Sequence, residues 1–475
     1  MTDLATASIS ELADLIRDRK ASPVEVMQAT LNRTEKLNAG LNAFISLYPD
    51  QAMDAARQAE KDMSDGKYRG PMHGIPLGIK DLYEVEGMSR TCGSSIMQEP
   101  PADEDATSVA RLKDAGAIVI GLLNLNEFAY GPTGINIHKG SARNPWNRDY
   151  SCGGSSSGAG CSVAARMVPG AMGSDTGGSI RLPASICGVV GLKQTYGLAS
   201  RHGIYPLCNS FDHGGPLTRT VRDAALMLQA FAGEDPLDPT TRGSRLDDYA
   251  GKLGQSIKGL KIGVPKSFFF DDVHPDTEKL VRAAIQVLTD LGADVRETDL
   301  LYGQEDVNNW NTMALAEAFA IHEEHLATQA DDLAYDVSSR LELGRDITAS
   351  EYLKARDGQT ALQQRIAAHM EDFDILAMPT TPVPGVNIET GNLVDGGVEY
   401  DGRAILGRLT RMAVFTGQPA ISVPCGLSGS GVPVGLQLVG RWFEDATVLG
   451  VADAYEQATA WHKMMPPDLP DTSIA

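Results

Sequence analysis

Along the chain, segments in which hydrophobic residues recur with the period of a helix alternate with short runs of apolar residues. Two helices are predicted to begin at the capping-box spacings of Ser8 with Glu11 and Ser22 with Glu25, and others lie over residues 50–64, 106–115, 220–231, 277–291, 307–369 and 444–459. Short apolar runs predict strands at residues 75–79, 117–120, 259–264, 375–378, 420–424 and 434–439. This alternation of helices with short strands predicts an α/β fold around a largely buried sheet.

A stretch rich in glycine and serine, residues 151–183, stands apart from this pattern. It holds two Gly/Ser clusters, 153–158 and 176–179, on either side of a helix-like apolar run at 159–172. Glycines beside a serine suit acyl-transfer chemistry, because a backbone without Cβ atoms can bring consecutive N–H groups close to a developing oxyanion. One isolated cluster is more often a flexible loop, but two clusters around an apolar run favour a functional site.

The composition narrows the classes of function. The chain has 475 residues, of which 42% are hydrophobic, enough for a substantial core. Its net charge of −21 argues against binding of nucleic acid through a broad basic surface. The N-terminus lacks the basic and apolar parts of a secretory signal, and no apolar run is long enough to cross a bilayer. We therefore expect a cytoplasmic protein with reduced thiols that does not bind membranes.

Three motifs carry a resemblance to a known family. They are GIPLGIKD at 74–81, GGSSSG at 153–158 and GSDTGGSIRLPASICGVVGLKQTYG at 173–197. In their order and spacing they resemble the amidase signature hydrolases. The resemblance implies a single large domain over residues 1–475, with a mixed twisted central sheet covered by helices on both faces. Within it, the family pattern implies N-terminal helices at 1–70, a signature core at about 71–232 and a variable, substrate-shaping and C-terminal part at about 233–475.

The resemblance places a Ser-cisSer-Lys triad on Lys80, Ser155 and Ser179. Ser179 is then the nucleophile, and it needs a group that removes its proton. A lysine serves as a base only where burial or a nearby cation lowers its pKa, and the apolar residues 75–79 before Lys80 predict burial. The Ser155 hydroxyl can both donate and accept a hydrogen bond, so it is expected to relay the proton.

The loop before the nucleophile is expected to bind the oxyanion. The predicted donors are the backbone N–H groups of Thr176, Gly177 and Gly178, together with that of the nucleophile itself. Asp175 is expected to brace this loop, and Arg181 to form structural charge-assisted hydrogen bonds beside it. This chemistry needs no cofactor and no metal ion.

Substrate contacts are predicted from the loop at 124–150, which faces the substrate in the resembled family. Tyr130, Gly131 and Thr133 are the candidates, although an ordinary Gly/Pro loop explains the same residues. Few basic residues lie near the motifs, which favours a small amide-type substrate with a neutral, for example aromatic, acyl group. We further expect a homodimer, with the N-terminal helices contributing to the contact.

The sequence supports other catalytic arrangements less well. Ser156 fits a G-x-S-x-G nucleophile elbow, but residues 144–150 before it do not form the required hydrophobic strand. The adjacent pair 212–213 offers Asp and His for a Ser-His-Asp triad, although neighbouring residues rarely aim at each other. The histidines in the sequence 322–325 lack the zinc-protease spacing and are predicted on an exposed helix face, and Cys187 is predicted in the core.

Two functions compete on these grounds. The first is a serine amidohydrolase that cleaves a C–N bond of an amide, anilide, hydrazide or carbamate through an acyl-enzyme. The second is the amidase-like subunit of a tRNA-dependent amidotransferase, which usually has a glutamine in place of His213 and a different loop at 136–139. Ser157 and Gln194 depart from residues common in the family, where glycine and proline are frequent. A non-catalytic binding protein is a third possibility, with little reason to keep all three triad residues.

Overall fold

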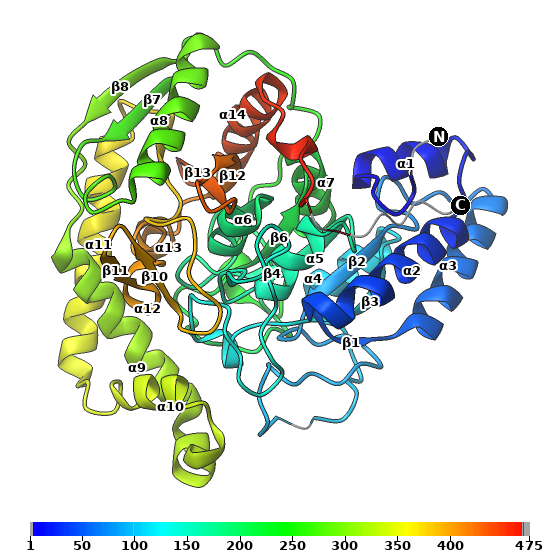
Figure 1. The fold of residues 1–475 in the computed structure, drawn as a ribbon, viewed down its shortest axis with the longest axis horizontal. Coiled ribbons are helices and arrows are strands. Elements are labelled where there is room, and N and C mark those ends of the chain that lie inside the picture. The colour runs from blue at the N-terminus through cyan, green and yellow to red at the C-terminus, as the bar shows by residue number, and fades with distance from the viewer. Residues whose placement is uncertain (1–2, 98, 468, 470–475) are drawn as a thin grey trace.

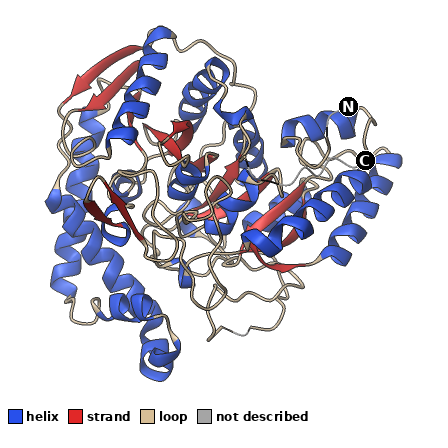
Figure 2. Ribbon diagram, viewed as in Figure 1, coloured by secondary structure: helices blue, strands red, loops and turns tan. Residues whose placement is uncertain are grey.

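The computed structural model describes residues 3–97, 99–467 and 469 (Figure 1). An 11-stranded sheet runs through the molecule in the order β1-β3-β2-β4-β6-β5-β12-β13-β9-β7-β8 (Figure 2). Its strands are β1 (Phe44–Leu47), β2 (Pro76–Lys80), β3 (Ile118–Leu123), β4 (Gly170–Ser174), β5 (Val190–Lys193), β6 (Gly214–Thr218), β7 (Lys261–Pro265), β8 (Asp294–Thr298), β9 (Ile375–Pro379), β12 (Ala420–Leu427) and β13 (Pro433–Gly440). A small hairpin consists of β10 (Asn392–Asp395) and β11 (Val398–Asp401).

The sheet is mixed, as predicted. β2 lies parallel to both of its neighbours, β3 and β4, and β7 lies parallel to β8 and β9. The strands between these two parallel parts pair antiparallel. Because the sheet combines strands from the region before residue 232 with strands from the region after it, the whole chain builds one architecture.

Helices cover both faces of the sheet. They are α1 (Ile9–Arg17), α2 (Pro23–Leu41), α3 (Pro49–Ser64), α4 (Thr107–Asp114), α5 (Ser157–Ala164), α6 (Arg181–Cys187), α7 (Val221–Phe231), α8 (Pro275–Asp290), α9 (Gln304–Gln329), α10 (Tyr335–Glu342), α11 (Ala349–His369), α12 (Gly402–Ile405), α13 (Arg411–Thr416) and α14 (Asp445–Ala458). α5 and α6 pack on each other and on the central strands, whereas α7, α14 and α8 form a second row. α9, α10 and α11 extend from the sheet as a separate helical group (Figure 1).

The predicted helix starts are confirmed. Both N-terminal capping boxes form, with Ser8 and Ser22 each accepting from the backbone N–H three residues later. The apolar run at 159–172 is only partly helical, because α5 ends at Ala164 and β4 begins at Gly170. The strand was missed because GAMGS consists mostly of small residues and carries no apolar alternation, yet all five positions are buried.

The described part of the chain contains no helix long and apolar enough to span a membrane. The cysteines are all buried and none forms a disulfide; they are Cys92, Cys152, Cys161, Cys187, Cys208 and Cys425. Cys187 is fully buried near the end of α6, which confirms its predicted place in the core.

Candidate active site

Lys80 is the last residue of β2, and its side chain is fully buried. Its Nζ donates hydrogen bonds to Ser155 Oγ at 2.7 Å and to Ser174 Oγ at 2.8 Å. Burial lowers the pKa of Lys80 from 10.5 to about 7, although the negative charges of Asp175 and Asp212 oppose the shift. Lys80 is therefore poised to exchange a proton near neutral pH.

Ser174 was not singled out from the sequence. It ends β4, beside β2, and its buried hydroxyl is the second acceptor for Lys80 Nζ. A sequence signal was present, because Ser174 is the second residue of the GSDTGGS motif, but nothing local says which serines of the motif face the lysine. The parallel pairing of β2 with β4 decides this contact.

Ser155 lies in a tight loop just before α5, and the peptide bond between Gly154 and Ser155 is cis. The loop is closely packed, since a Cβ at Gly154 would lie 2.0 Å from Asn126 Oδ1. The Asn126 N–H also donates to the Ser155 carbonyl at 3.1 Å. The glycines of the first cluster are thus required by close approach of other backbone segments and do not make a flexible linker.

The loop that carries Ser179 is braced by a buried ion pair. Arg181 donates to both carboxylate oxygens of Asp175 at 3.0 Å, and the same carboxylate accepts the backbone N–H groups of Gly178 and Ile180. Burial by itself would raise the pKa of Asp175, but Arg181 outweighs it and the pKa falls to about 2. The predicted structural roles of Asp175 and Arg181 are confirmed.

This bracing bears on the predicted oxyanion donors. The Gly178 N–H is already engaged by Asp175 Oδ1 at 2.7 Å. The N–H groups of Thr176, Gly177 and Ser179 have no hydrogen-bond partner among the described residues. The free N–H donors of the loop are therefore these three. Gly178 instead lets the loop adopt its conformation, because its φ of +125° is one that residues with a Cβ atom rarely take.

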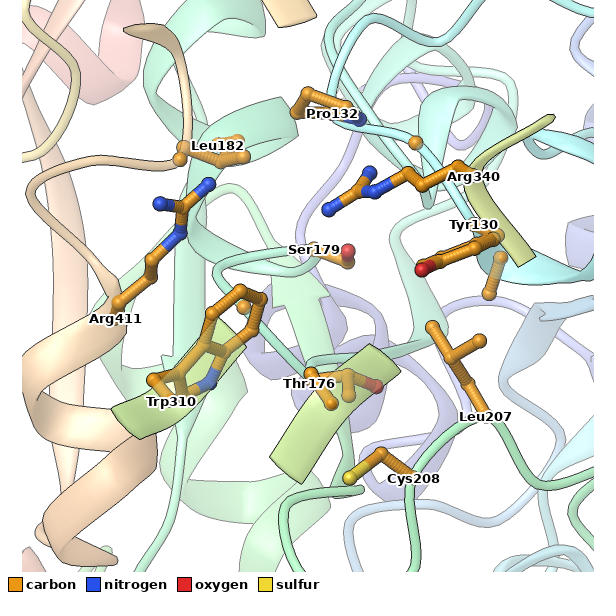
Figure 3. A pocket seen from close by; sticks show the side chains of 15 residues that line it. Tyr130, Pro132, Thr176, Ser179, Leu182, Leu207, Cys208, Trp310, Arg340 and Arg411 are labelled. Atoms are coloured by element: carbon orange, nitrogen blue, oxygen red, sulfur yellow. The ribbon is translucent and has the colours of Figure 1, made fainter. Parts of the chain in front are cut away.

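Ser179 lies in a pocket that opens to solvent (Figure 3). Its carbonyl accepts a hydrogen bond from the Ser156 N–H at 3.2 Å, which ties the two serine loops together. Its hydroxyl forms no hydrogen bond with Ser155 Oγ in the described structure. Hydrogen bonds of this kind are often long or absent without substrate and form in the substrate complex.

Two of the three predicted substrate-binding residues lie in the pocket and the third does not. Tyr130 and Gly131 line the pocket, and Figure 3 shows the Tyr130 hydroxyl pointing toward Ser179. Thr133 does not line it, because its buried hydroxyl is turned to the N–H of Ile135 within its own loop. Of the loop at 124–150, only residues 129–132 line the pocket.

Three large side chains in the pocket come from outside the motifs. Trp310 lies on α9, Arg340 on α10 and Arg411 at the start of α13. The expectation of a neutral acyl group assumed few basic residues near the nucleophile, and these two arginines remove that assumption. No local signal marks these two arginines, because they lie 161 and 232 residues after Ser179, in segments without a motif.

The alternative nucleophile Ser156 does not follow a strand and is not exposed. Its hydroxyl is fully buried, donates to the Ser174 carbonyl and accepts from the Ser174 N–H, both at 3.2 Å. The Asp212 carboxylate accepts from Thr176 Oγ1 at 2.5 Å, whereas His213 Nε2 lies 3.2 Å from Lys193 Nζ. Asp212 and His213 therefore do not form a relay toward Ser179.

The predicted exposed face for His322 is wrong. His322 is fully buried, and its ring packs edge-on against Phe128, with ring centroids 4.5 Å apart. The reason is that α9 lies over the loop after β3, so this face of the helix is covered. No group of three or more metal-binding side chains occurs among the described residues.

Known proteins resemble this chain in both sequence and fold. The Amidase family profile matches residues 25–449. The chain belongs to the amidase family. It is 38% identical to a glutamyl-tRNA(Gln) amidotransferase subunit of Geobacter metallireducens, over 97% of this chain and 99% of that protein, and 39% identical to an amidase of Pseudomonas putida, over 98% and 99%. The native peptide amidase of Stenotrophomonas maltophilia has a similar structure, with a TM-score of 0.83, 31% identity and coverage of 95% and 97%.

Proposed function

We propose that this amidase-family protein is a serine amidohydrolase that acts on a small amide-type substrate. The observation that carries the proposal is the contact of a fully buried Lys80 with Ser155 Oγ at 2.7 Å, beside a pocket that holds Ser179. A buried lysine of lowered pKa that contacts one serine hydroxyl, next to a loop that presents a second serine in a pocket, is an arrangement suited to activating a nucleophile.

In the proposed reaction, neutral Lys80 takes the proton of Ser155 as Ser155 takes that of Ser179. Ser179 Oγ then attacks the carbonyl carbon, and the oxyanion is held by the free N–H groups of Thr176, Gly177 and Ser179. The C–N bond breaks as the proton returns through Ser155 to the leaving nitrogen, which leaves an acyl-enzyme. Water activated by the same relay then attacks the ester and releases the acid and Ser179.

The test is a hydrolysis screen of the purified protein over amides, anilides, hydrazides and carbamates. Ser179→Ala is expected to lose turnover by about a thousandfold or more while it keeps the wild-type circular dichroism spectrum. Ser156→Ala is the matched control, because it removes a neighbouring hydroxyl that faces Ser174 and is expected to keep turnover. Full activity in Ser179→Ala, or loss confined to Ser156→Ala, would refute the assignment.

The second candidate is the amidase-like subunit of a tRNA-dependent amidotransferase. It is supported by the 38% identity to glutamyl-tRNA(Gln) amidotransferase subunits, over almost the full length of both chains. His213, where such subunits usually have glutamine, speaks against it; here the His213 ring faces Lys193. Turnover of small amides by the isolated chain, with its oligomeric state measured in the same preparation, would favour the hydrolase over the amidotransferase component.

A further inference from the structure

Two arginines flank the proposed nucleophile without a counter-charge. Arg340 and Arg411 line the same pocket as Ser179, and Figure 3 shows the Arg340 guanidinium group next to the serine and the Arg411 guanidinium group farther across the pocket. Neither arginine forms an ion pair with any described residue. In a chain with 62 acidic and 41 basic residues, carboxylates are abundant, so two unpaired arginines in one pocket need an explanation.

Aromatic rings hold both guanidinium groups in place. Arg340 lies over the ring of Tyr130, with its guanidinium carbon 4.4 Å from the centroid, and Arg411 lies over Trp310 at 4.7 Å. Stacking on an aromatic face fixes the plane of a guanidinium group but leaves its N–H groups free to bind a ligand. The Tyr130 hydroxyl, which points toward Ser179, adds a further polar group on the same side of the pocket.

The two cations also act on each other. Burial and, to a smaller extent, the charge of Arg340 together lower the pKa of Arg411 to about 10. Arg411 stays protonated at neutral pH, so the pocket holds two positive charges in a partly desolvated space. None of the 15 described residues that line the pocket is acidic. Binding of an anion would relieve this repulsion, whereas binding of a cation would add to it.

We propose that Arg340 and Arg411 form an anion subsite, and that the substrate is an amide which also carries a carboxylate and no free ammonium group. This inference depends on the proposed hydrolase, whose chemistry it leaves unchanged. Guanidinium groups bind carboxylates through paired, charge-assisted hydrogen bonds, so the subsite would also orient the amide carbonyl over Ser179. An amino-acid amide is disfavoured, since its ammonium group would meet two cations and no carboxylate.

The experiment measures binding to the Ser179→Ala protein by calorimetry. The ligands are the monoamides of succinic, glutaric and adipic acid, each compared with the uncharged amide of the same chain length, and glutamine as the glutaric monoamide with an ammonium group added. We expect at least one monoamide to bind about tenfold or more tightly than its uncharged counterpart. Glutamine should bind less tightly than the glutaric monoamide.

Substitutions then locate the subsite. Arg340→Gln and Arg411→Gln should each remove most of the preference for the charged amide, measured as the ratio of the charged to the uncharged affinity in the same variant. Arg345→Gln is the matched control, because Arg345 lies just beyond α10, pairs with Glu342 at 2.6 Å and does not line the pocket. If Arg340→Gln or Arg411→Gln folds poorly, the salt dependence of binding without these substitutions still tests the subsite. Added salt should lower the affinity for the charged amide and not that for the uncharged one.

Equal affinity for the charged and uncharged amides across the whole series would overturn the subsite. So would a preference that persists in both arginine variants, or tighter binding of glutamine than of the glutaric monoamide. Failure of the proposed function looks different: the wild-type protein would hydrolyse none of these amides or their anilides, whatever their order of affinity.

Discussion

The dependence of turnover on pH tests the role proposed for Lys80. At pH 7, a lysine with a pKa of 10.5 is neutral in only about three molecules in ten thousand, whereas a pKa of about 7 makes half of the molecules neutral. Burial thus raises the supply of free base by about a thousandfold. Since neutral Lys80 is the active form, kcat/KM should rise with pH through about 7 and then level off, and be about a hundredfold lower at pH 5 than on the plateau.

A second buried lysine makes this test more demanding. Burial also lowers the pKa of Lys193 to about 7, with help from Arg181, so the profile alone does not say which lysine titrates. Asp212 separates the two, because its charge raises the pKa of Lys80 and is not among the groups that act on Lys193. In Asp212→Asn the side chain can still pair with Thr176 and the loop amides, but it has lost its charge.

The assay is kcat/KM from pH 5 to 9 for wild type and Asp212→Asn with the best substrate of the screen. The midpoint of the rise should move to lower pH in the variant, since the ammonium form of Lys80 has lost a stabilising negative charge. An unchanged midpoint would assign the titration to Lys193 or another group, and a flat wild-type profile would refute a base with a pKa near 7.

Three further outcomes follow from the same geometry. Ser155→Ala should lower kcat by about a hundredfold or more in steady-state assays, because the relay between base and nucleophile is lost; wild-type kcat would contradict the relay. Gly177→Ala should reduce kcat by about tenfold, less than the hundredfold or more that a lost oxyanion donor costs, because its Cβ would lie 3.1 Å from the Trp310 ring and either the ring or the loop must shift; unaltered kinetics would place the oxyanion elsewhere. Arg181→Met should lower the free energy of unfolding by about 3–5 kcal/mol in urea titrations, since Asp175 would stay buried and unpaired; a loss below about 1 kcal/mol would contradict the bracing role.

Contacts within each motif could be predicted from the sequence, because the glycines and charged residues of a motif act on their near neighbours in the chain. Asp175, Gly178 and Arg181 lie within seven consecutive residues, so the brace between them could be read directly from the sequence. The burial of Lys80 was also predictable, since the apolar residues before it form a strand whose positions are all buried. Helix starts followed in the same way from capping side chains that bond three residues along the chain.

What the sequence did not determine depends on contacts between distant segments. Ser174 meets Lys80 only because β4 pairs with β2, and a strand of small residues gives no periodic signal. His322 is buried because α9 covers Phe128, and no local pattern reports such a cover. Arg340 and Arg411 carry no motif, and only the packing of their helices beside the sheet brings both charges to Ser179. The sequence by itself thus determined the family and the residues of the motif loops, whereas the tertiary structure decided the charge of the pocket, because that charge comes from two arginines that lie 161 and 232 positions after Ser179.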